Sequence, residues 1–320
     1  MSVINEAKLN GESGADGERD KGLSGVITDI SRCSLHDGPG VRTVVYFKGC
    51  ALRCKWCHNP ETLTVEKDMM FLNTKCIKCG RCLEVCPQCH SVVDDEVQID
   101  RSSCKHCGKC VDSCPAGALQ MVGREVTVEE LMTELRKDRH YYEMSGGGVT
   151  LSGGECLLQS EFAAALLEKC KEEGIHTTIE TALFVPWEKV ERVLPCVDLV
   201  YADLKIAEGA KHKEYTGQSN ERILSNLKNL SEAGKEVIVR IPLIPGVNDT
   251  SEELEKLGNV IKTLGGGVRA VEVLKYNYLA ESKYQSIGLT WANFGKETQS
   301  DETLERIRQQ LKEITGLVII

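Results

Sequence analysis

Three closely spaced cysteines, Cys50, Cys54 and Cys57, constrain this chain more than any other feature, because their sulfurs must all come from one tight loop. Their pattern is C-x3-C-x2-C. Three thiolates can hold three corners of a cubane iron–sulfur cluster, which leaves the fourth iron without a protein ligand. Since an open metal position is typical of a reactive site, the spacing predicts a reactive [4Fe–4S] centre. The alternatives are a zinc loop that lacks one ligand, or three unrelated buried thiols.

Eight further cysteines form two copies of a second pattern, C-x2-C-x2-C-x3-C-P. Bacterial two-cluster ferredoxins have this spacing, and in them the fourth cysteine of each copy ligates the cluster of the other copy. One predicted [4Fe–4S] centre is therefore held by Cys76, Cys79, Cys82 and Cys114, and the other by Cys86, Cys104, Cys107 and Cys110. Because every iron of these centres has a protein ligand, we expect them to deliver electrons. A double zinc ribbon is the alternative, but zinc sites require only paired C-x2-C and no cysteine–proline ending.

The composition favours a cytoplasmic metalloenzyme. Sixteen cysteines in clustered metal spacings indicate a reducing compartment rather than a secreted disulfide scaffold. The five cysteines outside these patterns are expected to be small buried hydrophobes: Cys33, Cys89, Cys156, Cys170 and Cys196. A formal net charge of −9 does not indicate a basic surface that binds nucleic acid. No apolar run approaches the roughly 20 residues of a membrane helix. Residues 1–21 lack the apolar core of a signal peptide and read as a disordered tail.

Strand and helix signals alternate along the chain outside the cysteine-rich region. Apolar, β-branched runs occur at 43–47, 148–151, 177–181, 197–204, 236–241 and 270–274. Amphipathic stretches lie between them at 128–139, 161–173, 186–194, 221–233 and 251–264. Glycine and asparagine separate many of these segments, as turns require. Six parallel strands with helical crossovers predict an α/β domain.

Four motifs in order resemble the radical S-adenosylmethionine (SAM) enzymes, and specifically the activating enzymes of glycyl radical enzymes. The motifs are DGPGVR at 37–42, KGCALRCKWCHNPET at 48–62, SGGGVTLSGGE at 145–155 and DLK at 203–205. The resemblance covers roughly residues 25–285. It implies a partial (β/α)6 barrel that binds reactants at the carboxyl ends of its strands.

The resemblance and the cysteine spacing together divide the chain into four parts. Residues 1–24 would be the disordered tail, and residues 25–66 the first part of the radical SAM barrel with its cysteine loop. Residues 67–123 would form an inserted, bacterial-ferredoxin-like domain with two [4Fe–4S] centres. Residues 124–320 would complete the barrel.

The resemblance also implies where SAM binds. The amino group and carboxylate of SAM would chelate the open iron of the Cys50 loop. Gly153 and Gly154 would let the backbone approach the methionine moiety closely, and Glu155 would face its ammonium group. Trp56 would lie against the adenine. An ordinary turn at the start of a helix is the alternative for the Gly-Gly-Glu sequence.

The strand at 197–204 provides an independent indication. Alternation places Asp203 and Lys205 on one face, which points into the predicted barrel. Because burying charged groups costs free energy, a charged pair at this place indicates a specific role. By resemblance, Lys205 would contact the SAM carboxylate, whereas a plain buried salt bridge with Asp203 is the alternative. The resemblance further implies a monovalent cation site near Asp203, with Glu180 and Thr181 at the end of the neighbouring strand.

Three more positions complete the predicted site. Arg240 alternates onto the inner face of its strand and is a candidate contact for the ribose or the carboxylate of SAM. The family often has a histidine after the sixth strand, and we expect Asn277 to replace it in this chain. Cys156 stands where the family usually has proline, beside the binding residues rather than among them.

The resemblance implies a protein substrate. The 5′-deoxyadenosyl radical made from SAM would remove a hydrogen from one glycine of a partner glycyl radical enzyme, and reduced flavodoxin or ferredoxin would supply the electron. The long cysteine-rich segment is similar to that of activases for choline lyase, glycerol or hydroxyproline dehydratase, arylsuccinate synthase or isethionate lyase. Two alternatives remain: a radical SAM enzyme for a small molecule or peptide, and a ferredoxin-like electron carrier.

Overall fold

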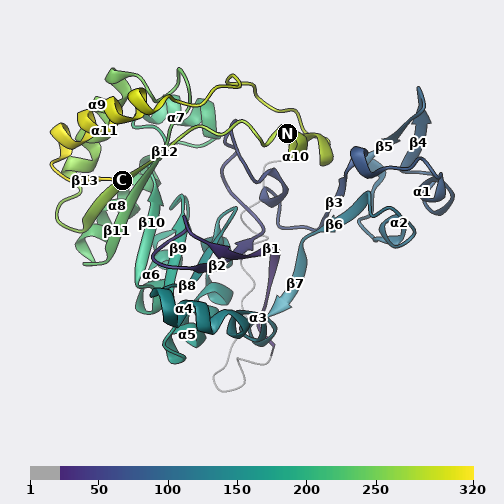
Figure 1. Cartoon of the computed structure of the whole chain (residues 1–320), viewed down its shortest axis with the longest axis horizontal. Coiled ribbons are helices and arrows are strands. Elements are labelled where there is room, and N and C mark those ends of the chain that lie inside the picture. The colour runs from purple at the N-terminus through teal and green to yellow at the C-terminus, as the bar shows by residue number, and fades with distance from the viewer. Residues whose placement is uncertain (1–21) are drawn as a thin grey trace.

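The computed structural model describes residues 22–320, so the tail expected at 1–24 lies almost entirely outside the described residues. A nine-stranded sheet dominates this part of the chain, in the order β13-β12-β11-β10-β9-β8-β2-β1-β7 (Figure 1). Its strands are β1 (Ser24–Ser34), β2 (Arg42–Phe47), β7 (Arg124–Thr127), β8 (Gly148–Gly153), β9 (His176–Thr181), β10 (Leu199–Asp203), β11 (Glu236–Pro242), β12 (Val268–Leu274) and β13 (Val318–Ile319). From β2 to β13 the pairs are parallel, which confirms the predicted α/β class with a mostly parallel sheet.

All six predicted strands form, as β2, β8, β9, β10, β11 and β12. The sequence patterns did not predict β1, β7 and β13. β1 is antiparallel to both β2 and β7, and nine of its eleven residues are exposed or half-buried. A strand that is largely exposed lacks the continuous apolar run of a strand buried on both faces. Cys33 was expected to be buried, but it is exposed, because a register shift between Ser31 and Ser34 turns it to solvent.

Helices cover the outer face of the sheet (Figure 1). They are α3 (Val128–Leu135), α4 (Arg139–Ser145), α5 (Ser160–Glu172), α6 (Trp187–Val193), α8 (Glu221–Glu232), α9 (Ser251–Thr263) and α11 (Asp301–Thr315). Two further helices, α7 (Gly209–Thr216) and α10 (Glu281–Ser286), contact the loop that follows β2 instead. Val200 and Ala202 of β10 pack into the core beneath the covering helices, whereas Tyr201 packs on the opposite face beside Ile238. The alternation predicted for this strand therefore holds, and its polar side chains face inward. None of the helices in residues 22–320 has the length and apolar character needed to span a membrane.

Residues 68–122, which we call the insert, leave the sheet after β2 and return to it at β7 (Figure 1). The insert holds two small antiparallel sheets, β3 with β6 and β4 with β5. Its elements are β3 (Asp68–Phe71), α1 (Arg81–Val85), β4 (His90–Val93), β5 (Glu96–Ile99), α2 (Lys109–Asp112) and β6 (Leu119–Val122). Its small core contains Met69 and Leu119 together with several cysteines.

Short 3-10 helices lie in turns between these elements. They are η2 (Pro60–Thr62), η3 (Asn73–Lys75), η4 (Arg101–Ser103), η5 (Arg136–Asp138), η6 (Cys156–Gln159) and η7 (Leu194–Cys196). η2 follows the cysteine loop after β2, and η6 follows the glycine loop after β8. Both loops leave the carboxyl ends of parallel strands, the edge at which such folds bind their ligands.

Candidate functional site

A cavity of about 440 Å³ opens at the carboxyl ends of the parallel strands. The loops after β2 and β8 and the ends of β10, β11 and β12 contribute to its wall. Ten predicted site residues line it: Cys50, Cys54, Trp56, Cys57, Gly153, Gly154, Asp203, Lys205, Arg240 and Asn277. The structure therefore brings together residues that are up to 227 positions apart, with Glu155 as the exception among the predicted residues of this site.

The cysteine loop is held in place by backbone contacts. The amides of Arg53 and Lys55 donate to the carbonyls of Thr216 (2.7 Å) and Tyr215 (2.9 Å), which end α7. Burial raises the pKa of the Cys50 and Cys54 thiols to about 12. Without metal, these thiols are therefore protonated at neutral pH, and a metal must displace their protons to bind them.

The three loop thiols fit a cluster better than a single ion. Within residues 22–320, no three His, Cys, Asp or Glu side chains lie close enough together to hold one metal ion. Cys50, Cys54 and Cys57 nevertheless border the same cavity, and none of them forms a disulfide. An iron–sulfur cluster gives each thiolate its own iron, so it suits sulfurs that converge on one space without touching.

The glycines of the β8 loop are required by close packing. Gly153 has φ +113°, and a Cβ there would lie 2.3 Å from the backbone of Phe47. A Cβ on Gly154 would lie 2.3 Å from the carbonyl oxygen of Gly49. Glycine alone tolerates both the positive φ and the close approach. The β8 loop therefore presents bare backbone to the cavity, directly beside the start of the cysteine loop.

Glu155 does not line the cavity, although we expected it to meet an ammonium group there. Its carboxylate accepts hydrogen bonds from the Thr181 hydroxyl (2.8 Å) and from the amides of Ala182 (2.9 Å) and Leu157 (3.2 Å). The side chain is buried, at 1% exposure, and this burial raises its pKa to about 7. Glu155 thus ties the loop after β8 to the end of β9.

We expect the burial of Glu155 to appear in the pH dependence of stability. Because its folded pKa is raised to about 7, the folded chain binds more protons than the unfolded chain between roughly pH 4.5 and 7. The free energy of unfolding should therefore fall as the pH rises through this window, by on the order of 3 kcal/mol. Glu155→Gln removes this titration. The melting temperature of the variant minus that of the wild type should therefore increase from pH 5 to about pH 8. Calorimetry of both chains measures the difference, with exposed Glu161→Gln as the control, and a constant difference across this range would contradict the expectation.

Asp203 and Lys205 form an ion pair at the cavity wall, with 2.6 Å between the Lys205 Nζ and an Asp203 carboxylate oxygen. Burial acts to lower the pKa of Lys205, but Asp203 and the Cys54 sulfur raise it more, so the ammonium group stays charged. The Lys205 side chain is 11% exposed and faces the same space as the cysteine loop. The salt bridge considered from the sequence is thus present, and it lies where a ligand carboxylate could reach the ammonium group.

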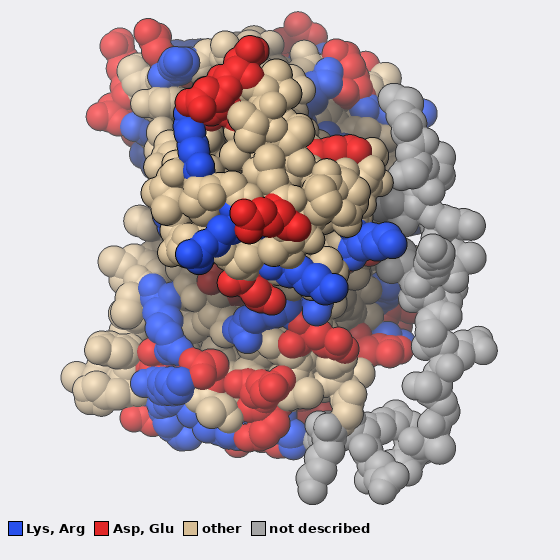
Figure 2. Space-filling view, turned by 90° about the vertical axis from the view of Figure 1, so that its right-hand side faces the viewer, with Lys and Arg blue, Asp and Glu red and all other residues tan. Residues whose placement is uncertain are grey.

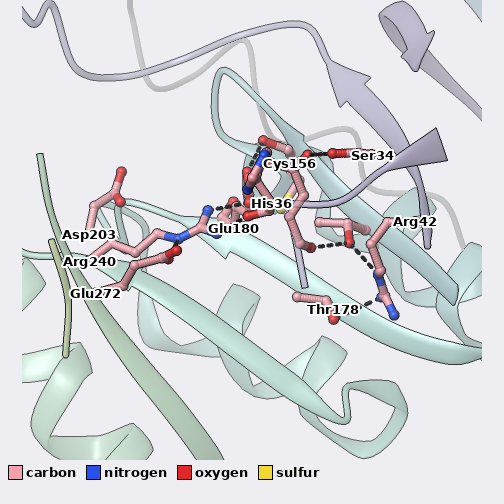
Figure 3. Close-up of polar contacts among 12 residues, drawn as sticks. Ser34, His36, Arg42, Cys156, Thr178, Glu180, Asp203, Arg240 and Glu272 are labelled. Atoms are coloured by element: carbon pink, nitrogen blue, oxygen red, sulfur yellow. Dashed lines mark hydrogen bonds and ion pairs between the residues drawn. The ribbon is translucent and has the colours of Figure 1, made fainter. Parts of the chain in front are cut away.

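Arg240 forms the centre of a charged network that joins three strands (Figure 3). Its guanidinium donates to Glu180 of β9, to Glu272 of β12 and to the carbonyl of His36, the last at 2.8 Å. The guanidinium also lies 3.7 Å from the centre of the Tyr201 ring. Burial acts to lower the pKa of Arg240, but the two carboxylates raise it above its usual value. Each guanidinium nitrogen therefore already has a protein partner.

Sequence reasoning missed Glu272 and His58. Glu272 is on the same face of its strand as Ala270, so alternation along 268–274 could have revealed it. His58 directly follows the last cysteine of the loop and contacts the carbonyl of Asn277 at 2.6 Å. Asn277 itself accepts a hydrogen bond from the amide of Leu279, at 2.9 Å.

Aromatic side chains form one wall of the cavity. The Trp56 ring is buried and packs against Tyr215 and Phe294, with ring centres 6.2 and 6.1 Å apart. Tyr276 and Ile244 complete this apolar group. The wall excludes water from the side of the cavity next to Cys54, which packs on the same group.

The insert brings its cysteines together in two places. Cys76, Cys79, Cys82 and Cys114 line one small cavity, the set that the crossed ferredoxin pattern predicts. Cys86, Cys104 and Cys110 pack together in the core of the insert, whereas Cys107 is exposed.

Figure 2, which views the molecule from the side that carries the insert, shows Lys and Arg interspersed with Asp and Glu on that face.

Comparison with known proteins identifies the family. The model of the radical SAM superfamily matches residues 44–258. The (2S)-3-sulfopropanediol dehydratase activating enzyme of Klebsiella oxytoca is 44% identical over 83% of this chain and 86% of its own length. The trans-4-hydroxy-L-proline dehydratase activating enzyme of Clostridioides difficile is 42% identical over 90% of this chain and 96% of its own. The chain therefore belongs to the radical SAM superfamily and, within it, to the activating enzymes of glycyl radical enzymes.

A solved structure supports the fold alone. Streptococcus suis SuiB bound to the precursor peptide SuiA has a TM-score of 0.51 and 16% identity, over 86% of this chain and 47% of that chain. Membership of the superfamily implies a [4Fe–4S] cluster and SAM as cofactors.

Proposed function

We propose that this chain activates a glycyl radical enzyme by cleaving SAM reductively and removing one hydrogen atom from a glycine α-carbon of that partner. The observation that supports this best is the convergence of Cys50, Cys54 and Cys57 with Lys205 on one cavity at the carboxyl ends of the strands. The relatives at 44% and 42% identity are both named as activating enzymes of dehydratases. Their names differ in the enzyme served, so the partner of this chain is proposed as a class only.

The cysteine loop would hold the SAM-binding cluster through Cys50, Cys54 and Cys57. When bound, this cluster supplies the electron that breaks the sulfonium bond of SAM and yields the 5′-deoxyadenosyl radical. Lys205, kept charged by Asp203, would neutralise the SAM carboxylate. Gly153 would offer its backbone to the methionine moiety.

Residues around this centre would orient the nucleoside and exclude water. Trp56 would cover the adenine from within its aromatic wall, and Asn277 would contact the nucleoside in place of the histidine frequent in the family. We assign Arg240 to orienting the cavity wall, because its guanidinium already bonds Glu180 and Glu272. A monovalent cation beside Asp203 is also part of the proposal.

The insert would hold two further [4Fe–4S] centres, which makes three in all. The shared cavity of Cys76, Cys79, Cys82 and Cys114 supports the crossed assignment of ligands. We propose that residues 67–123 act as a ferredoxin-like domain that accepts electrons from reduced flavodoxin or ferredoxin. The reducing cytoplasm would keep all of these thiols available.

The sheet would act as a partial (β/α)6 barrel. Its edge strands in the described chain, β7 and β13, pair with β1 and β12 and not with each other, which supports an open arrangement. A loop of the partner that carries the target glycine could enter through such an opening. Glycine suits this reaction because it has no side chain to block access to the α-carbon.

The test is direct detection of the partner radical. Mixed anaerobically with SAM, a reductant and its partner, the chain should produce a doublet in electron paramagnetic resonance, from the one α-hydrogen left on the glycine. Deuterium placed at that α-carbon should appear in 5′-deoxyadenosine. Substitution of that glycine by alanine is the control and should remove the doublet. If SAM is consumed but no deuterium is transferred, the activase proposal is wrong. The alternative of a radical SAM enzyme that acts on a small molecule or peptide is then favoured. If SAM neither binds nor is cleaved, the electron-carrier alternative takes its place.

A further inference from the structure

The segment of residues 276–291, which we call the α10 segment, lies between the cysteine loop and the insert (Figure 1). On the side of the cysteine loop, Lys283 donates to the Asn59 amide oxygen at 2.9 Å and pairs with Glu61 at 3.0 Å. Tyr284 is buried, and α10 packs against η2, which follows the cysteine loop. The α10 segment is therefore anchored directly beside the last cysteine of the loop.

On its other side the α10 segment contacts Arg101 of the insert. Arg101 donates to the carbonyl of Ser286 at 2.6 Å and also to the carbonyl of Met69, which is on β3 of the insert. Its guanidinium is 3.5 Å from the Asp68 carboxylate. A planar guanidinium with five donors can bridge two carbonyls and a carboxylate at once, which a lysine ammonium cannot do with the same geometry.

Gly288 makes room for this arginine. It has φ +72°, and a Cβ there would lie 2.6 Å from the Arg101 Nε and 2.9 Å from its Cδ. The backbone of the α10 segment thus folds closely over the guanidinium. Arg101 and Gly288 form a contact at which the two parts of the chain fit together without spare space.

The contacts of Arg101 lead to one of the two cysteine sets in the insert. Arg101 begins η4, and its carbonyl accepts from the Cys104 amide at 3.3 Å. Met69, whose carbonyl Arg101 binds, has its sulfur 3.4 Å from the Cys110 sulfur. The cavity lined by Cys76 and Cys114, in contrast, is lined by residues of the insert alone.

We infer that Arg101 is a positioning residue that latches the insert to the α10 segment and so holds the set containing Cys104 and Cys110 next to the Cys50 site. The inference rests on the proposed function, since it assumes that both places hold iron–sulfur centres. Two chain connections join the insert to the sheet, and such connections alone leave room for hinge motion. A latch is therefore needed to keep a constant separation between the two centres.

The experiment compares four variants of the full chain, reconstituted anaerobically with iron and sulfide. Arg101→Gln removes the latch, Arg101→Lys keeps the charge without the bridging geometry, and Gly288→Ala pushes the guanidinium away. Arg124→Gln, an exposed arginine just beyond the insert, is the matched control. Hydrogen exchange is followed at residues 277–291, and magnetic coupling between reduced centres is measured by electron paramagnetic resonance.

Arg101→Gln and Gly288→Ala should each speed exchange in the α10 segment by at least about tenfold, since the segment then opens locally more often. Arg101→Lys should be intermediate, and Arg124→Gln unchanged. The magnetic coupling should weaken in the first two variants while their iron content stays at the wild-type level, which a purely local structural role would not produce. If Arg101→Gln fails to fold, the exchange rate and the magnetic coupling of Gly288→Ala test the inference.

Unchanged exchange together with unchanged coupling in Gly288→Ala would overturn the latch. That outcome is distinct from failure of the proposed function. In that case the electron paramagnetic resonance spectrum of the wild-type chain would contain no cluster signal other than that of the Cys50 centre. Exchange that speeds up without a change in coupling would also overturn the positioning role, because the separation of the centres would then not depend on Arg101.

Discussion

Replacing Cys54 with alanine is expected to abolish SAM cleavage, even with a strong chemical reductant. Cys54 borders the cavity between Cys50 and Cys57, and two remaining thiolates cannot retain a cluster that needs three. The rate of 5′-deoxyadenosine formation should fall at least about a thousandfold, or about 4 kcal/mol in activation free energy. Chromatography of the reaction mixture measures the product.

Two other cysteine variants separate this role from general damage. Cys79→Ala removes a thiol, which we propose as a cluster ligand, from the small cavity of the insert, so it should keep SAM cleavage by direct chemical reduction but impair turnover with a protein donor. Cys196→Ala, at a half-buried thiol of η7 outside both sites, should change neither. Equal and complete loss of SAM binding in the Cys54 and Cys79 variants, with the fold intact, would contradict the division of roles.

Replacing Arg240 with alanine should lower the free energy of unfolding by about 3–5 kcal/mol, because it leaves buried carboxylates without their cation. Glu180 and Glu272 both pair with Arg240, and the pKa of Glu180, raised by burial and lowered by Arg240, already stands at about 7. Loss of the guanidinium should raise this pKa further, so the destabilisation should grow as the pH rises. Denaturant unfolding at about pH 6 and pH 8 measures both effects.

An exposed ion pair on the same sheet provides the control. Arg269 and Glu236 lie 2.9 Å apart, with side chains 66% and 58% exposed. Arg269→Ala should therefore cost less than about 1 kcal/mol at either pH. A similar loss of stability in the Arg240 and Arg269 variants would show that the buried network does not depend on its cation.

Features that depend on neighbouring positions in the sequence were predicted well. The spacing of Cys50, Cys54 and Cys57 places three sulfurs in one loop, because a metal site of this kind uses short local gaps. Cys114 was predicted to join Cys76 although the two are 38 positions apart, and they border one cavity. The six central strands followed from β-branched apolar runs, since strands buried on both faces need such runs.

Features that depend on the meeting of several elements could not be predicted. The carboxylate of Glu155 accepts hydrogen bonds from Thr181 and Ala182 at the end of β9, so no local pattern reveals that it is buried there. Arg240 was a candidate contact for SAM and lines the cavity, but its pairing with Glu180 and Glu272 from neighbouring strands could not be predicted from its own strand. A buried charge binds whichever opposite charge the fold places beside it.

The contact between Arg101 and the α10 segment shows the same limit over a longer distance. No pattern in the sequence around Arg101 predicts its contact with Ser286, which lies 185 positions away. Spacing and alternation indicate which residues can hold metal and which face the core, because these properties arise within one loop or strand. Which charged groups become partners, and which part of the insert contacts the α10 segment, is decided by tertiary packing, since only packing brings distant segments within hydrogen-bonding distance.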